Sequence, residues 1–218
     1  MALIFGRYGY DDNVKMADIL AKEEVGLVSA SPYKEVRRGV WVWQSDEPIV
    51  QLEQLARLTD AEKAQYDRIS SPSRRREYLT VRASVSAILG KRISYRPSKA
   101  PFIADDDRFI SISHTGNWVV VAVDTKPTGV DTEYMTRDIS RVSSRIFSSH
   151  EMSLTDNLAV LWCAKEAAYK AYGREGIDLY NDITVTDITG NRIFVNILSQ
   201  HITLLFLTID KHIIVVCE

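Results

Sequence analysis

An α+β fold is predicted for this 218-residue chain from the order of its helical and strand-like segments. Two stretches with helical hydrophobic spacing, residues 75–89 and 159–172, each come before a group of strand-like segments. From residue 109 onward the apolar period shortens to that of strands, and the tail at residues 183–217 continues as strands. Strands gathered in this way favour an α+β arrangement over the strict alternation of a doubly wound sheet.

The N-terminal part of the chain gives few structural signals. Residues 1–38 are polar and mixed, with short helices expected around residues 14–22 and no assigned role. Residues 39–43 predict a strand, because β-branched and aromatic residues alternate there. A helix is expected to begin at Thr59, since Glu62 stands three positions further on in the arrangement of a capping box.

A longer helix is predicted over residues 75–89, ending at Gly90, because its apolar positions recur every three or four residues. Period-two spacing then predicts strands at residues 109–113 and 118–124, joined by a short turn. A third strand is expected at residues 129–133. The helix therefore precedes a group of three strands.

Helices and then strands are expected in the C-terminal part of the chain. Helices are predicted at residues 140–147 and 159–172, and Gly173 is placed to close the second in the left-handed conformation. The tail at residues 183–217 predicts three strands, with a turn at residues 189–191 between the first two.

The composition is that of an ordinary globular protein, with 45% hydrophobic and 26% charged residues and a net charge of −2. Cys163 and Cys217 are too few and too far apart for a disulfide framework or a zinc site. No apolar run approaches the roughly 18 residues of a membrane span, and the first residues lack a secretory signal. A cytoplasmic protein without membrane contact is therefore expected.

Basic residues are concentrated in one region although the net charge is small. Between Lys63 and Arg108, 11 basic side chains stand against five acidic ones, which predicts an anionic ligand. Nucleic acid is the competing anion, but no nucleic-acid-binding motif accompanies the charge, so none is expected to bind. The sequence also lacks the motifs of dinucleotide enzymes, serine hydrolases and P-loop nucleotide triphosphatases.

Two segments carry residue types suited to catalysis. Asp131 and Glu133 are two apart in a predicted strand, so both carboxylates face the same side. Glu166 and Lys170 are four apart in a predicted helix and share a face with Trp162. Each segment alone is typical of a solvated surface. Together they indicate a magnesium ion that also binds phosphate oxygens.

With these segments the chain resembles the 4'-phosphopantetheinyl transferases, in particular the long, two-lobed type that activates peptide, polyketide and siderophore synthetases. That family carries a Gly-Val/Ile-Asp-x-Glu strand, matched at residues 129–133, and a Trp/Phe-x-x-Lys-Glu-Ala/Ser-x-x-Lys helix, matched at residues 162–170. Shorter matches are Ser-His-Thr at residues 113–115, Lys-Ala-Pro at residues 99–101 and Phe-Ser-Ser-His-Glu at residues 147–151. The resemblance extends in order over residues 41–173.

The chain departs from the family pattern at a few positions. Thr132 stands where the family has an aliphatic residue, so its hydroxyl needs a partner if it faces the core. Ser111 replaces the family's asparagine, and Ser98 and Ala100 alter its Gly-Lys-Pro turn. These changes affect the nucleotide loop and leave the acidic residues intact.

The resemblance implies an enzyme that moves the 4'-phosphopantetheine group of coenzyme A onto a serine of an apo carrier protein, leaving 3',5'-ADP. It implies that Asp131, Glu133 and Glu166 hold Mg²⁺ together with the pyrophosphate of coenzyme A. Glu166 would act as the base toward the serine, directly or through a water, and Lys170 would stabilise or protonate the leaving group. Coenzyme A contacts are implied for seven further residues: Ser113, His114, Lys99, Lys63, Arg75, Arg82 and Lys165.

The same resemblance implies a monomeric pseudo-dimer of two similar α+β lobes, with coenzyme A in the cleft between them. The lobes are expected at residues 39–125 and 126–218, and the second would carry the metal site. Residues 1–38 are expected to form an N-terminal extension of unknown role.

A basic stripe is predicted in the second lobe, where Arg137, Arg141 and Arg145 are spaced four apart close to Phe147. An acidic carrier protein would dock there, although a solvated helix face is an equal alternative. Two rival functions also remain open: a non-catalytic relative that binds coenzyme A or a carrier, and a nucleic-acid-binding protein with its basic patch at residues 74–76.

Overall fold

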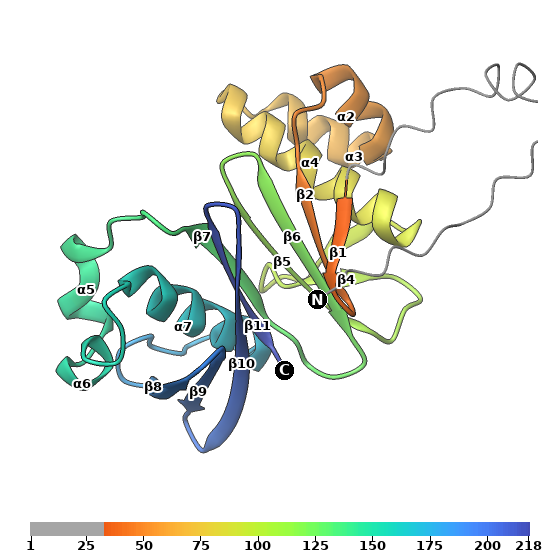
Figure 1. Cartoon of the computed structure of the whole chain (residues 1–218). Helices are drawn as coiled ribbons and strands as arrows, with labels where there is room; N and C mark the ends of the chain where they lie inside the picture. Colours follow the sequence, from red (N-terminus) through yellow and green to blue (C-terminus); the bar gives the residue numbers. More distant parts are fainter. Residues whose placement is uncertain (1–32) are drawn as a thin grey trace, which may run out of the picture. The chain divides into compact units, whose positions relative to one another are not determined.

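The computed structural model describes residues 33–218, so the helices expected around residues 14–22 lie outside the described residues. Within this part the chain forms two α+β lobes, one following the other along the sequence (Figure 1). The α+β class predicted from the sequence is confirmed. No helix in residues 33–218 is both long enough and apolar enough to cross a membrane.

The first lobe is built on an antiparallel sheet with the strand order β1-β2-β6-β5. Residues 33–37, expected to belong to an N-terminal extension, instead form the edge strand of this sheet because they pair with β2. The strands are β1 (Tyr33–Arg37), β2 (Val40–Gln44), β5 (Phe109–Thr115) and β6 (Trp118–Asp124). A separate hairpin consists of β3 (Ile93–Tyr95) and β4 (Pro101–Ile103).

Three helices accompany this sheet: α2 (Ile49–Ala56), α3 (Asp60–Asp67) and α4 (Pro72–Leu89). The predicted capping box of α3 is confirmed, with the Thr59 hydroxyl accepting from the Glu62 N–H. The helix α4 begins three residues earlier than predicted, because the Ser71 hydroxyl caps it and Pro72 occupies its first position. It ends at Gly90, as predicted, in the left-handed conformation.

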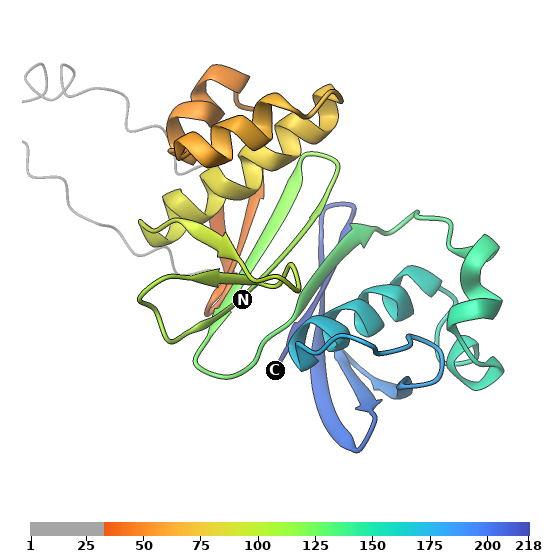
Figure 2. The ribbon, with the colours of Figure 1, turned by 180° about the vertical axis from the view of Figure 1, so that it is seen from behind.

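The second lobe has a five-stranded sheet with the order β7-β11-β10-β9-β8, again with antiparallel neighbours. Its strands are β7 (Val130–Tyr134), β8 (Ile183–Thr189), β9 (Arg192–Ile197), β10 (Gln200–Ile209) and β11 (His212–Cys217). Its helices are α5 (Ser140–Ile146), α6 (Ser149–Met152) and α7 (Leu158–Tyr172), and α7 packs against the sheet (Figure 2). The boundary expected after residue 125 falls in the connection between β6 and β7.

The prediction of three strands in the tail is wrong, because residues 183–217 form four. The turn at residues 189–191 is confirmed, with Gly190 at a φ of 61°. The turn between β9 and β10 uses Leu198 at a φ of 52°, and the turn before β11 uses Asp210 at 51°. Since these turns contain neither glycine nor proline, the usual sequence signals of a strand end are missing there.

The two lobes share one connectivity. In each, one strand leads into helices, β2 in the first lobe and β7 in the second, and the chain then returns as a run of strands. That strand pairs with the last strand of its lobe, which pairs in turn with the strand before it: β2-β6-β5 in the first lobe and β7-β11-β10 in the second. The two sheets therefore have the same order for these three strands, and the strands of each sheet pair only with strands of their own lobe.

The lobes meet through apolar side chains from both sheets. One buried cluster joins Val40, Val42 and Val120 of the first sheet to Val130 and Ile214 of the second. Burial of this surface stabilises the contact between lobes through the hydrophobic effect. The edge strands β5 and β7 also lie against each other at this junction, which positions the residues of the candidate site.

Candidate active site

Asp131 and Glu133 lie on the same face of β7, as the two-residue period of a strand predicts. Both residues are buried, and each is only 6% exposed. Thr132 between them donates its hydroxyl to the Ile213 carbonyl at 2.7 Å, so its expected need for a partner is confirmed. The strand therefore presents two nearly buried carboxylates side by side.

Each of these carboxylates is paired with a cation. The Lys170 Nζ lies 2.7 Å from Asp131 Oδ1 and 3.0 Å from the Val130 carbonyl. Glu133 forms an ion pair with Arg137, whose guanidinium lies 5.5 Å from the ring centroid of Trp162. Arg137 is therefore part of the site and not simply part of an exposed basic stripe.

The first lobe contributes hydroxyl groups to the same two carboxylates. Ser113 donates to Asp131 at 2.7 Å, and Thr115 donates to Glu133 at 3.1 Å. The role of Thr115 was not predicted from the sequence. The alternation of Ser111, Ser113 and Thr115 along one face of β5 is the signal that could have revealed it.

Glu166 approaches this pair from α7, on the same helical face as Trp162 and Lys170. Burial raises the pKa of Glu166, and the negative charge of Asp131 raises it further. The cations Lys170 and Arg137 act in the opposite direction but do not cancel the shift. Glu166 and Asp131 are therefore close enough to repel each other.

The three predicted metal ligands are not gathered as a finished metal site. Within residues 33–218, no three histidine, cysteine, aspartate or glutamate side chains converge so that they could hold one ion. The donor set nevertheless fits Mg²⁺, which prefers carboxylate oxygens and keeps some positions for water or phosphate. A divalent cation would also relieve the repulsion between Asp131 and Glu166.

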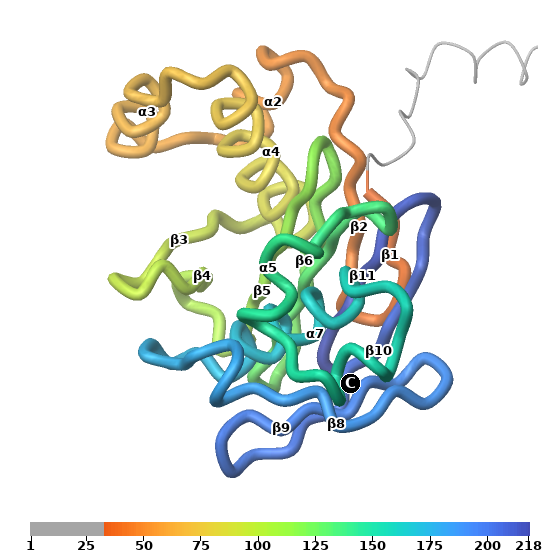
Figure 3. The backbone as a smooth tube through the Cα atoms, turned by 90° about the vertical axis from the view of Figure 1, so that its left-hand side faces the viewer, coloured from red at the N-terminus to blue at the C-terminus, as the bar shows by residue number. Residues whose placement is uncertain are grey.

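A cavity of about 1410 Å³ opens beside Lys170, whereas Asp131, Glu133 and Glu166 do not line it. It is lined by α4, the β3–β4 hairpin and β5 from the first lobe, and by the last turn of α7 from the second. Figure 3 shows the hairpin projecting from the first lobe. Four residues predicted from the sequence line the cavity: Arg82, Lys99, His114 and Lys170. The volume is sufficient for a large nucleotide-containing ligand.

The cationic residues of the cavity are held in different ways. Arg82 is 8% exposed, lies 3.4 Å from the Tyr78 ring centroid and donates to Glu62 at 3.0 Å. The His114 Nε2 lies 3.3 Å from a carboxylate oxygen of Glu77. Lys99 lies in the turn of the β3–β4 hairpin at a φ of 65°. Arg82 is therefore fixed in the wall, while Lys99 and His114 lie at exposed or partly exposed positions.

Three further predicted coenzyme A contacts do not line this cavity. Lys63 pairs with Asp67 on the surface. Arg75 lies 4.4 Å from the ring centroid of Tyr66 and also faces Asp67. Ser113 is buried, and its hydroxyl is bonded to Asp131.

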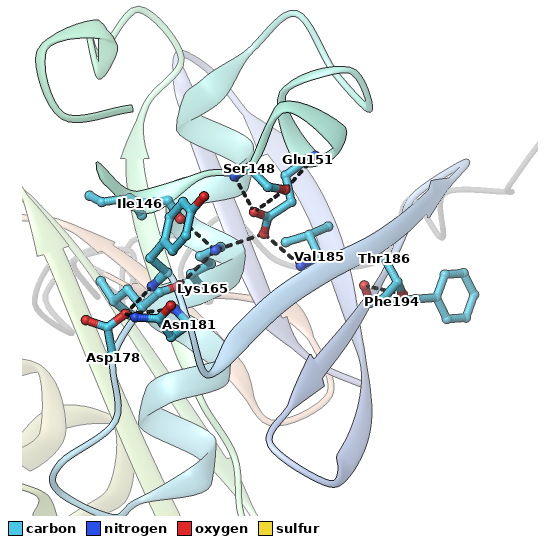
Figure 4. A network of polar contacts seen from close by, with 11 residues as sticks. Ile146, Ser148, Glu151, Lys165, Asp178, Asn181, Val185, Thr186 and Phe194 are labelled. Carbon is cyan, nitrogen blue, oxygen red and sulfur yellow. Dashed lines mark hydrogen bonds and ion pairs between the residues drawn. The ribbon is translucent and has the colours of Figure 1, made fainter. Parts of the chain in front are cut away.

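Lys165, the last predicted coenzyme A contact, lies in the core and not in the cavity (Figure 4). Its ammonium group is fully buried and has three partners: the carbonyls of Ile146 and Leu179 at 2.7 and 2.8 Å, and Glu151 at 2.8 Å. An ammonium group has three donors, so none is left for a ligand. The structure therefore corrects this assignment, because Lys165 has a structural role.

Comparison with known proteins shows a likeness to one family over the C-terminal part of the chain. The model of the 4'-phosphopantetheinyl transferase superfamily matches residues 127–217, which include β7, α7 and the tail strands. Residues 127–217 are therefore similar to this superfamily, in agreement with the resemblance in the motifs.

Individual relatives carry the corresponding names. A 4'-phosphopantetheinyl transferase of Bacillus subtilis is 38% identical over 84 residues, covering 34% of this chain and 38% of the relative. The 4'-phosphopantetheinyl transferase Sfp of Bacillus subtilis is 36% identical over 94 residues, covering 38% of this chain and 42% of the relative. A putative 4'-phosphopantetheinyl transferase of Synechocystis is 25% identical over 159 residues, covering 62% and 64%. The chain thus matches less than two thirds of the length of each.

Proposed function

We propose that this chain is a 4'-phosphopantetheinyl transferase, which moves the 4'-phosphopantetheine group of coenzyme A onto a serine hydroxyl of an apo carrier protein. The observation that carries the proposal is the junction of the lobes. There Asp131, with Glu133 and Glu166 beside it, pairs with Lys170, which lines a large cavity with cationic walls, and residues 127–217 match the superfamily model. Pure binding of coenzyme A requires neither a base nor three carboxylates.

Coenzyme A would occupy the cavity, with its phosphates toward the cationic groups. Lys99 and His114 lie there together with Arg96, which was not predicted. The Arg96 guanidinium lies 4.9 Å from the Phe102 ring centroid, so a flat cationic surface is available beside the hairpin. Such groups neutralise phosphate charge and fix the position of the reacting phosphorus.

Asp131, Glu133 and Glu166 would hold Mg²⁺, which when bound supplies positive charge to the diphosphate of coenzyme A. Glu166 would accept the proton of the carrier serine, directly or through a water. The serine oxygen would bond to the phosphorus of the phosphopantetheine group as the bond from that phosphorus to 3',5'-ADP breaks. Lys170 is placed to stabilise or protonate the departing oxygen.

A transfer assay tests this function. The full chain is incubated with coenzyme A, Mg²⁺ and several apo carrier proteins, and the intact carriers are weighed by mass spectrometry. A gain of the phosphopantetheine mass on serine is expected, and excess EDTA should remove it. Coenzyme A binding without any gain in mass would favour the non-catalytic relative instead. If the chain binds nucleic acid and does not bind coenzyme A, the alternative of a nucleic-acid-binding protein is favoured.

The carrier would dock on α5, where Arg141 and Arg145 are both exposed. Reversing both charges, as Arg141→Glu with Arg145→Glu, should raise the KM for the carrier about 10-fold at low salt, because complementary charge speeds docking. The KM for coenzyme A should not change. Steady-state kinetics with each substrate varied in turn measures the difference.

The first lobe offers a control variant with the same change in charge, since Lys34 and Arg38 are also exposed. The double variant Lys34→Glu with Arg38→Glu should leave the KM for the carrier near its original value. If the α5 variant behaves like this control at low salt, docking on α5 is ruled out. The exposed arginines would then be a solvated helix face.

A further inference from the structure

Three hydroxyl groups on β5 are directed at β7. Ser111 accepts from the Val130 N–H at 3.0 Å, Ser113 donates to Asp131 at 2.7 Å and Thr115 donates to Glu133 at 3.1 Å. These residues alternate along the strand, so they share one face. That face is turned toward β7, and Ser111 and Ser113 are both buried.

The contact between β5 and β7 is not a backbone ladder. Each strand ends the pairing order of its own sheet, and the two are not paired with each other. The residue numbers differ by 18 in both the Ser113–Asp131 and the Thr115–Glu133 pair. The strands therefore run in the same direction, and the spacing of the hydroxyls matches the spacing of the carboxylates.

The direction of the Ser113 hydroxyl is determined by its surroundings. Its oxygen accepts the Thr132 N–H at 3.2 Å, so its single proton is available for Asp131. Asp131 Oδ1 thus accepts from both the Ser113 hydroxyl and the Lys170 ammonium group. Glu133 is held at both oxygens, by Thr115 at Oε2 and by Arg137 at Oε1.

We infer that Ser113 and Thr115 are positioning residues, through which the first lobe orients the two carboxylates of the second lobe for the metal ion. The inference rests on the proposed function, because it assigns these hydroxyls to the metal site. Hydrogen bonds from outside the ligand set orient ligands, and their loss commonly lowers metal affinity about 10- to 100-fold.

Ser111 supplies a matched control. Like Ser113, it joins β5 to β7 by its hydroxyl, but it bonds only to a backbone N–H and touches no carboxylate. Ser111→Ala therefore weakens the junction between the lobes without altering the ligands. A role limited to holding the lobes together predicts equal effects of the two alanine variants on metal binding.

The test measures metal binding without turnover. The full chain is mixed with coenzyme A and no carrier, and Mn²⁺ replaces Mg²⁺ so that the free ion is followed by electron paramagnetic resonance. Ser113→Ala and Thr115→Val should weaken Mn²⁺ binding about 10- to 100-fold. Thr115→Ser, which keeps the hydroxyl, and Ser111→Ala should bind Mn²⁺ like the original chain.

Two results would overturn the positioning role. One is that Ser113→Ala and Thr115→Val bind Mn²⁺ as tightly as the original chain. The other is that Ser111→Ala loses as much Mn²⁺ affinity as these two variants do. If Ser113→Ala does not fold, the pair Thr115→Val and Thr115→Ser decides, since Thr115 is only partly buried. Failure of the proposed function is seen separately, because the original chain would then bind Mn²⁺ and coenzyme A yet transfer nothing to any carrier.

Discussion

Asp131→Asn is expected to lower the rate of phosphopantetheine transfer about 10²- to 10³-fold, the range found when one electrostatic contact to developing charge is removed. The amide keeps the shape of the side chain but removes the charge that pairs with Lys170 and that would bind the metal ion. Lys170 retains the Val130 carbonyl as a partner, so its position should change little. The rate of carrier modification at saturating coenzyme A measures the effect.

The matched control is Asp187→Asn, the same chemical change at an exposed position of β8 outside the cavity. This variant should transfer at the original rate. Thermal unfolding of both variants separates loss of chemistry from loss of fold. Full activity in a folded Asp131→Asn protein would remove Asp131 from the mechanism and, with it, the proposed metal site.

Lys165→Met is expected to destabilise the protein by about 3–5 kcal/mol, the usual cost of leaving one partner of a buried ion pair alone. Lys165 is fully buried and Glu151 is 2% exposed, so water cannot replace the lost partner. The Ile146 and Leu179 carbonyls would lose their donor as well. Urea unfolding followed by circular dichroism measures the change in the free energy of unfolding.

Two comparisons make this prediction specific. Lys63→Met removes the same charge from the exposed pair with Asp67 and should change stability little, because water screens such pairs. Adding Glu151→Gln to Lys165→Met should recover part of the loss, since the uncompensated charge is then removed. If Lys165→Met unfolds at the same urea concentration as the original protein, the buried pair does not stabilise the fold.

The same pair makes stability depend on pH in acid. Burial raises the pKa of Glu151, but donors from Lys165, Ser148 and Val185 outweigh it and bring the pKa below its ordinary 4.5. Between the two values the unfolded chain binds more protons than the folded one, so stability rises with pH. The contribution is complete above about pH 4.5 and is lost as the pH falls through the folded-state pKa. The Glu151→Gln variant should lack this part of the pH dependence in urea unfolding.

Much of the fold could be predicted because its signals are local. The capping box at Thr59 and the glycines at 90 and 173 mark helix ends through contacts within a few residues. The helix α2 was missed because Pro48 precedes it without a side-chain cap and Arg57 closes it where glycine is usual. Such an end depends on packing against α4 and not on the local sequence.

The site could be predicted only in part for a similar reason. The shared face of Asp131 and Glu133 follows from the period of one strand. The hydroxyls of β5 reach them only through the contact between lobes, which no single segment specifies. Lys165 was misassigned although its spacing was informative, since Leu161 and Ala168 lie on the same helical face and are fully buried.

Every hydrogen bond between β5 and β7 described above uses a hydroxyl of β5, so the alignment of the two strands depends on which residues of β5 face β7. A shift of β5 by one residue would turn its serines and threonine away and bring Ile112 and His114 toward the carboxylates. A burial-driven contact of valines tolerates small displacements, whereas hydrogen bonds at 2.7 and 3.1 Å do not. Metal affinity would therefore report whether the two halves of the chain have docked in the correct alignment, and it offers a sensitive assay for reassembly of the protein from separately expressed halves.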